Sequence, residues 1–231
     1  MWEETGERLG LEMAKTTEVD ITKTSFEDFV AFLFDRDVSL ESEGRDFWYW
    51  HVEVEFDAKK IAAYYVQLFR QPEFLLERFT KAQLDEGFWA IQVENLDCSV
   101  ATIINDSDLP ISVREECIRS MTDLFTRLFA KGKFHTSVWM WWDSLCFDWD
   151  CGNRNRERGG EDLELQDIFF QTLADVLAID SWICQHAALH GLGHLHHPQT
   201  AELIDRFIDE HRSLTEEQKK YALAAAKFEV Q

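Results

Sequence analysis

Apolar residues recur at three- and four-residue spacing along most of the chain, which is the pattern of amphipathic helices. Caps and breakers at the ends of these runs give the boundaries, with Pro198 and Gly132 among the stops. The pattern predicts helices over residues 24–34, 57–70, 72–79, 80–92, 112–131, 139–149, 161–179, 181–197, 199–209 and 213–228, with a further short one within 95–105.

One segment, Asp46 to Phe56, alternates apolar and polar residues as a strand does. A single strand without a partner is unstable, so an extended loop is the alternative. The fold class predicted from the pattern is therefore all-α or mostly α, with one short extended segment near 46–56.

The chain is organised around the stretch from Cys184 to Asp209. Asp180 or Ser181 can cap the first helix there, and His196-His197-Pro198 ends it because proline disfavours helical backbone in the residue before it. The second helix carries one apolar stripe, formed by Ala201, Ile204, Phe207 and Ile208. Small residues in the first helix allow another helix to approach closely.

This stretch resembles the short HEAT-like repeats first described in phycobilin lyases, with Ala188, Leu192, Gly193 and Pro198 on the signature positions. The resemblance is centred on residues 184–209, and the rest of the chain departs from a clear repeat. It implies helix pairs stacked into a right-handed α-α superhelix whose concave surface binds another protein. No lyase activity is carried over.

Length and composition fit one continuous helical unit. Three prolines and ten glycines in 231 residues are too few for the turn-rich sandwich or barrel architectures. We expect a single HEAT-like domain over residues 24–231, preceded by a poorly ordered lead-in over residues 1–23, where the pattern is charged and weakly periodic.

The formal net charge of -21 changes the choice of partners. It disfavours direct binding to nucleic acid or to an anionic membrane, because both need clustered Lys and Arg. A basic protein is the natural complement, although an acidic surface also serves plain solubility.

Cysteine usage and the chain's start favour a cytoplasmic location. The five cysteines are scattered and form no Cys-x-x-Cys, as expected of reduced thiols. Residues 1–4 lack the basic and apolar regions of a signal peptide. The uncharged run from Ser181 to Ala201 contains five histidines, two glycines and a proline, so we expect no membrane span there.

The clearest candidate for chemistry is a histidine row. His186, His190 and His194 are each four residues apart and share one helix face, and two imidazoles at that spacing, such as His186 and His190, can share a divalent metal. No Glu follows in the zincin position His-Glu-x-x-His, so a metalloprotease base is absent from its usual place. In the HEAT-like alignment the row faces outward, which favours a partner-facing surface with at most adventitious binding of zinc or nickel and no resident cofactor.

Three further features are candidates for function. Asp143 shares a face with Met140 and Phe147, so a buried Asp143 would need a partner, and a binding or catalytic role is the alternative to a structural anchor. Trp141 is a candidate exposed aromatic of a contact surface. The segment from Cys151 to Gly160 carries three arginines and three glycines and reads as a functional or disordered loop.

The sequence thus predicts a non-enzymatic protein that binds a basic protein partner through His186, His190, His194, Asp143 and Trp141, with no catalytic residues. An immunity or inhibitor protein against a basic toxin is the specific form, since negative charge accelerates capture of such a target. The alternative is a metal-dependent hydrolase that uses the histidine row with Asp or Glu from neighbouring helices.

Overall fold

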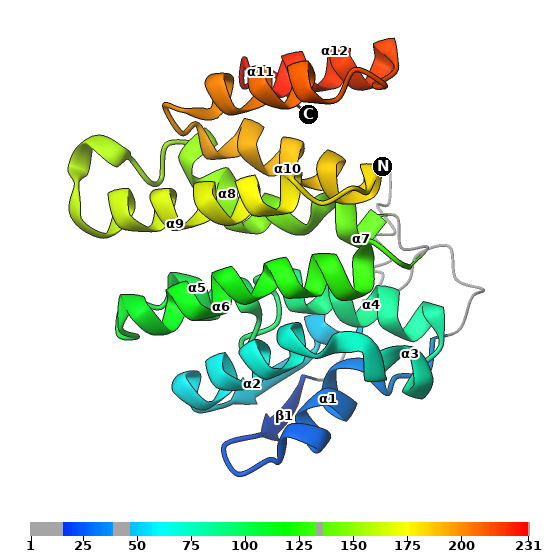
Figure 1. Ribbon diagram of the computed structural model, residues 1–231. Coiled ribbons are helices and arrows are strands. Elements are labelled where there is room, and N and C mark those ends of the chain that lie inside the picture. The colour runs from blue at the N-terminus through cyan, green and yellow to red at the C-terminus, as the bar shows by residue number, and fades with distance from the viewer. Residues whose placement is uncertain (1–15, 39–46, 133–135, 231) are drawn as a thin grey trace, which may run out of the picture.

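The computed structural model describes residues 16–38, 47–132 and 136–230. It is mostly helical, which confirms the predicted class at that level (Figure 1). The elements are β1 (Thr17–Asp20), α1 (Phe26–Phe34), η1 (Trp48–Trp50), β2 (Val52–Glu55), α2 (Ala58–Arg70), η2 (Pro72–Phe74), α3 (Leu75–Arg78), α4 (Lys81–Gln92), α5 (Val100–Asn105), α6 (Ile111–Leu124), η3 (Phe125–Phe129), α7 (Thr136–Trp139), η4 (Met140–Trp142), α8 (Asp143–Asp150), η5 (Arg156–Arg158), α9 (Gly160–Leu177), α10 (Trp182–Leu195), α11 (Thr200–Glu210) and α12 (Glu216–Ala225).

The helices are stacked in layers that follow the chain. Helix α2 packs on α6, α6 packs on α9, and α9 packs on α10, as the progression from cyan to orange in Figure 1 shows. Helices α11 and α12 lie against each other at the C-terminal end, where α12 also contacts α10. Helix α10 is enclosed by α7, α8, α9 and α12, so side chains on nearly every face of it are buried.

Side-chain caps account for several helix starts. Asp57 accepts from the backbone N–H of Lys60, and Thr80 forms a capping box with Gln83, as these sequence positions predict. The helix predicted from residue 112 begins one residue earlier, because α6 starts at Ile111 behind Pro110, whose ring fixes a helix-compatible φ.

A small parallel sheet corrects the expected lead-in over residues 1–23. Strand β1 pairs with β2 in a register that sets Glu18 opposite Glu53 and Asp20 opposite Glu55. Residues 16–23 therefore belong to the folded unit, while residues 1–15 lie outside the described residues, as does Asp46 of the predicted strand. The extended segment near 46–56 is confirmed in part, since Val52–Glu55 is a strand and Trp48–Trp50 is a 3-10 turn.

Aromatic rings fill the core between the N-terminal and C-terminal layers. The single helix predicted over residues 139–149 is divided into α7, η4 and α8, and η4 points Trp141 and Trp142 inward, where both are fully buried. Trp141 packs edge-on against Phe129 at 5.4 Å and Phe69 at 5.7 Å between ring centroids.

None of the described helices has both the length and the apolar composition needed to cross a membrane.

Candidate metal centre

Helix α10 holds His190 and His194 one turn apart inside the protein. It begins after Ser181 and ends at His196, which takes a left-handed φ of 53° and turns the chain before Pro198. Gly191 lets α10 approach η4 closely, since a Cβ at this position would lie 2.7 Å from the Cβ of Trp142. Only 1% of His190 and 7% of His194 is exposed. The two imidazoles are therefore fixed by packing on a rigid element.

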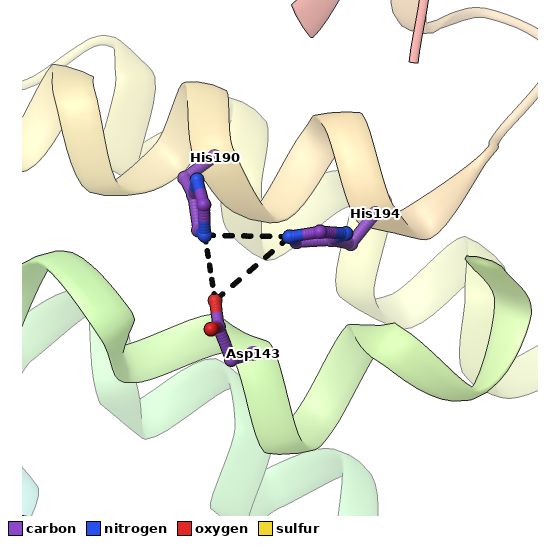
Figure 2. Close-up of side chains that lie close together, drawn as sticks. All are labelled: Asp143, His190 and His194. Atoms are coloured by element: carbon purple, nitrogen blue, oxygen red, sulfur yellow. Dashed lines mark hydrogen bonds and ion pairs between the residues drawn. The ribbon is translucent and has the colours of Figure 1, made fainter. Parts of the chain in front are cut away.

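The first residue of α8, Asp143, faces both imidazoles (Figure 2). Its Oδ1 lies 2.7 Å from His190 Nε2 and 4.0 Å from His194 Nε2, and the two Nε2 atoms are 3.3 Å apart. Two ligands bound at about 2.0–2.1 Å to a tetrahedral zinc ion lie about 3.3 Å from each other. The three observed separations bracket this value, so one point in space is within reach of all three atoms.

The outer nitrogens of the two imidazoles have partners of their own. His190 Nδ1 lies 2.8 Å from the hydroxyl of Tyr221, and His194 Nδ1 lies 3.7 Å from Asp150 Oδ2. Metal-binding histidines use such outer partners to hold the ring and its tautomer. A proton on each Nδ1 leaves both Nε2 atoms unprotonated, and these two atoms lie close to each other and to Asp143 (Figure 2).

Asp143 Oδ1 is a buried acceptor without a well-directed donor. It accepts no hydrogen bond of acceptable geometry, even though it lies 2.7 Å from His190 Nε2. A ring N–H at His190 Nε2 would not be aligned with Oδ1 as a hydrogen bond requires, so we take the short distance as proximity of two acceptors. A buried carboxylate oxygen that lacks a donor is costly unless a cation lies against it.

The electrostatics favour neutral imidazoles. Burial lowers the pKa of His194, and His190 lowers it further, against the opposing effect of Asp143 and Asp150. Burial and His190 likewise lower the pKa of His186. Neutral imidazole is the form that binds a metal, so His194 is in the binding state over a wider pH range than an exposed histidine is.

His186, which the sequence pairs with His190 as metal ligands, is not part of the cluster. Its ring stacks on Trp139 at 5.3 Å and on Trp182 at 5.5 Å, and Tyr221 lies at 4.3 Å. The group of side chains close enough together to hold a metal ion consists of His190, His194 and Asp143. Sequence reasoning selected Asp143 as a carboxylate in need of a partner, but only the packing of α8 on α10 shows that the histidines are beside it.

The expected outward-facing partner surface is corrected as well. Trp141 is fully buried in the aromatic core, and His190 and His194 are nearly so. The physical reason is that helices enclose α10, with Tyr221 of α12 covering the side on which the repeat alignment placed solvent. Of the residues expected to contact a partner, Asp143 and His186 are partly exposed, with 31% of the Asp143 side chain accessible.

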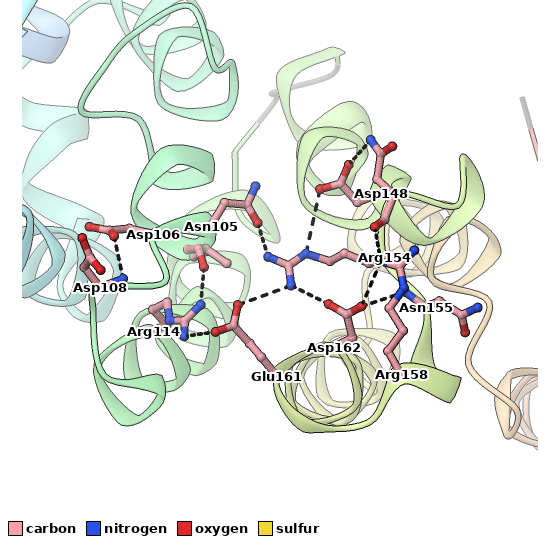
Figure 3. A network of polar contacts seen from close by, with 12 residues as sticks. Asn105, Asp106, Asp108, Arg114, Asp148, Arg154, Asn155, Arg158, Glu161 and Asp162 are labelled. Atoms are coloured by element: carbon pink, nitrogen blue, oxygen red, sulfur yellow. Dashed lines mark hydrogen bonds and ion pairs between the residues drawn. The ribbon is translucent and has the colours of Figure 1, made fainter.

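The arginine-rich segment from Cys151 to Gly160 is held by ion pairs, which rules out the idea that it is a free basic loop (Figure 3). Arg154 lies 3.0 Å from Asp162 and also hydrogen-bonds Asn105. Arg156 pairs with Asp167, and Arg158 lies 3.6 Å from Asp162. Carboxylates of the same protein therefore neutralise the positive charges of the segment, and these ion pairs connect the segment to α9.

The same network contains a buried arginine that gives a first prediction. Arg114 of α6 has 3% of its side chain exposed and donates to Glu161 of α9 at 2.7 Å. Glu161→Gln is expected to lower the free energy of unfolding by about 1–3 kcal/mol at pH 7, because it leaves a buried guanidinium without its anion, discounted for the partial exposure of Glu161. Glu115→Gln, which removes an exposed pair with Arg119, should cost no more than about 0.5 kcal/mol.

Acid should remove the difference between wild type and Glu161→Gln. The hydrogen bond from Arg114 is the main cause that lowers the pKa of Glu161. A carboxyl group whose pKa is lower in the folded state stabilises the fold above its unfolded pKa of about 4.3 and loses this effect as the pH falls through the folded value. Urea unfolding followed by circular dichroism at pH 7 and pH 3.5 measures both effects, and an equal deficit at the two pH values would contradict the ion-pair account.

Comparison with known proteins adds no relative. The chain matches no known family model, no curated protein and no solved structure.

Proposed function

We propose that this protein binds one divalent transition-metal ion between α8 and α10, through Asp143 Oδ1, His190 Nε2 and His194 Nε2. The observation that carries the proposal is the convergence of three acceptor atoms at ligand-like separations, one of them a buried carboxylate oxygen without a well-directed donor. Two imidazole nitrogens and one carboxylate oxygen suit zinc, and the same donor set also binds ferrous iron. Zinc is the ion we expect.

A metal titration tests this proposal. Tag-free protein, freed of metal by a chelator, is expected to bind one Zn²⁺ per chain with a Kd of about 1 μM or tighter by calorimetry. Binding to the folded state should raise the free energy of unfolding by about 2.7 kcal/mol when free zinc is at 100 times Kd. His194→Ala should abolish the stoichiometric event, and His211→Ala, which removes the histidine that follows α11, should leave it intact. Binding that both variants weaken equally would show adventitious metal.

The number of protein ligands supports the hydrolase alternative as the enzymatic form of this proposal. Three protein ligands leave a coordination position, as in catalytic zinc sites, and 31% of the Asp143 side chain is accessible although its Oδ1 is buried. Bound zinc lowers the pKa of a water ligand to about 7, which supplies a nucleophile at neutral pH. Metal-dependent cleavage of activated esters or phosphodiesters, absent in His194→Ala, would support this form. An identical background rate in both proteins would contradict it.

We also propose that the protein binds a basic protein, with an immunity or inhibitor role as the specific form. The net charge of -21 supports this, and so does the internal use of positive charge, since Arg114, Arg154 and Arg156 are all paired with carboxylates. Uncompensated charge is therefore mainly negative, including the carboxylates that face each other across β1 and β2. The surface differs from the predicted one, because α10 is enclosed.

The HEAT-like assignment is kept as a proposal for the C-terminal helices. Helices α10 and α11 coincide with the two helices of the matched stretch, and the turn between them contains Pro198. Ala188 and Leu192 are fully buried, which suits signature positions that serve packing.

A further inference from the structure

A second site lies in the N-terminal half, far from α10 in the sequence. It is a cavity of about 530 Å³, within the range of about 300–1,000 Å³ that is typical of ligand pockets. Four aromatic rings and two carboxylates form most of its wall, contributed by Phe47, Tyr49, Trp50, Trp89, Asp85 and Glu86. Among the described lining residues there is no lysine, arginine or histidine, so the charge of the wall is negative.

The rings are held in fixed relation to one another. Phe47 stacks on Tyr49 at 5.3 Å with an interplanar angle of 18°, and it meets Trp50 edge-on at 5.0 Å. Tyr49 is buried, whereas 51% of Trp50 is exposed, so Trp50 stands at the mouth. An exposed tryptophan beside a cavity is a frequent contact residue in binding sites.

The carboxylates come from one helix that also supplies an indole. Asp85 and Glu86 of α4 are followed one turn later by Trp89. Asp85 is oriented by Ser137, whose hydroxyl donates to its Oδ1 at 2.7 Å. Glu86 and Tyr49 line the same wall, and burial, with the Glu86 carboxylate as the next cause, raises the pKa of Tyr49 to about 12.

Aromatic faces combined with carboxylates form the recognition chemistry of an organic cation. The 3-10 helix η1, which carries Tyr49 and Trp50, already holds an organic cation of the protein itself. The guanidinium of Arg36 lies 4.0 Å from the ring centroid of Trp48 in that helix. We propose that the cavity receives a cationic side chain, arginine or lysine, of a basic polypeptide. This inference rests on the basic-partner proposal, and it is independent of the metal centre.

The test uses a fluorescein-labelled peptide of twelve residues with alternating arginine and glycine, titrated with the full chain at 150 mM NaCl and followed by fluorescence anisotropy. Trp50→Ala removes a ring without changing charge, and Asp85→Asn removes one charge without changing shape. Each is expected to weaken peptide binding at least about fivefold, since a desolvated cation–π contact or a close charge contributes on that scale.

Matched controls separate the cavity from general attraction to an acidic protein. Leu76→Ala removes an exposed apolar side chain on α3, and Asp205→Asn removes one exposed charge on α11. Both should keep the affinity within twofold of wild type. N-methylguanidinium should displace the peptide more effectively than sodium at the same ionic strength.

Three results would overturn the inference. If all four variants bind the peptide as wild type does, a basic partner is still attracted, but through another surface, and the assignment of the cavity fails. If tetramethylammonium saturates the cavity while peptide binding ignores Trp50 and Asp85, the cavity takes a small organic cation and no side chain of a polypeptide. A wild-type protein that does not bind the peptide at all would remove the basic-partner proposal along with the inference.

Discussion

Replacing Asp143 with asparagine is expected to weaken zinc binding about a hundred- to a thousandfold, on the order of 3–4 kcal/mol. Asparagine keeps the shape of the side chain but removes the anionic ligand, and its neutral carbonyl oxygen is a poor donor for zinc. His190 and His194 alone leave the ion with two nitrogens. Calorimetric titration of the two metal-free proteins measures the change.

The stability of metal-free Asp143→Asn distinguishes a metal site from a structural ion pair. Asp143 Oδ1 is buried and has no well-directed donor, so removing its charge should leave the free energy of unfolding unchanged or higher without metal. If His190 were instead protonated and paired with Asp143, the substitution would break a buried ion pair and destabilise the metal-free protein by several kcal/mol. That outcome would refute the metal centre.

Two further properties belong to the same expectation. Asp150→Asn, which changes the outer partner of His194, should cost about 10- to 100-fold in zinc affinity.

Zinc binding should persist somewhat below the ordinary histidine pKa of about 6.5, because burial lowers the pKa of His194 and keeps its ring neutral to more acidic pH. As the pH falls further, protons displace the metal and the affinity drops.

Local chemistry explains which parts of the fold the sequence could predict. Asp57 and Thr80 cap helices through hydrogen bonds to residues three positions on, so their signal is contained in a few residues. Strand β1 has no such signal, because its partner β2 lies more than thirty residues away and only their pairing makes either one a strand. The sequence pattern therefore predicts no strand in the lead-in over residues 1–23, where β1 lies.

The candidate site was predictable in the same limited sense. Four-residue spacing correctly places His190 and His194 on one face of a helix. Tertiary packing determines which face of α10 lies against α8 and which lies against α12. As a result, His186 stacks on tryptophans and His194 lies near Asp143. The repeat alignment suggested solvent on that face because it contains no information about α12.

Trp141→Ala is expected to lower the free energy of unfolding by about 3–5 kcal/mol, the cost of removing a large aromatic side chain from a packed core. Trp141 is completely buried, lies in edge-on contact with Phe69, Phe125 and Phe129, and donates its indole N–H to Met121 Sδ at 3.3 Å. Because typical domains are stable by only about 5–15 kcal/mol, this loss is a large fraction of the total.

Trp50→Ala is the matched control, since it makes the same chemical change at a ring that is 51% exposed. It should cost about 1 kcal/mol or less, because little packing is lost at a half-exposed site. Urea unfolding of the two variants gives both values. If Trp141 were instead a surface residue that contacts a partner, its replacement would lower the free energy of unfolding as little as that of Trp50 does. Such a result would contradict the buried position of η4. A large loss at Trp141 with a small one at Trp50 would assign the first ring to the core and leave only the second for recognition.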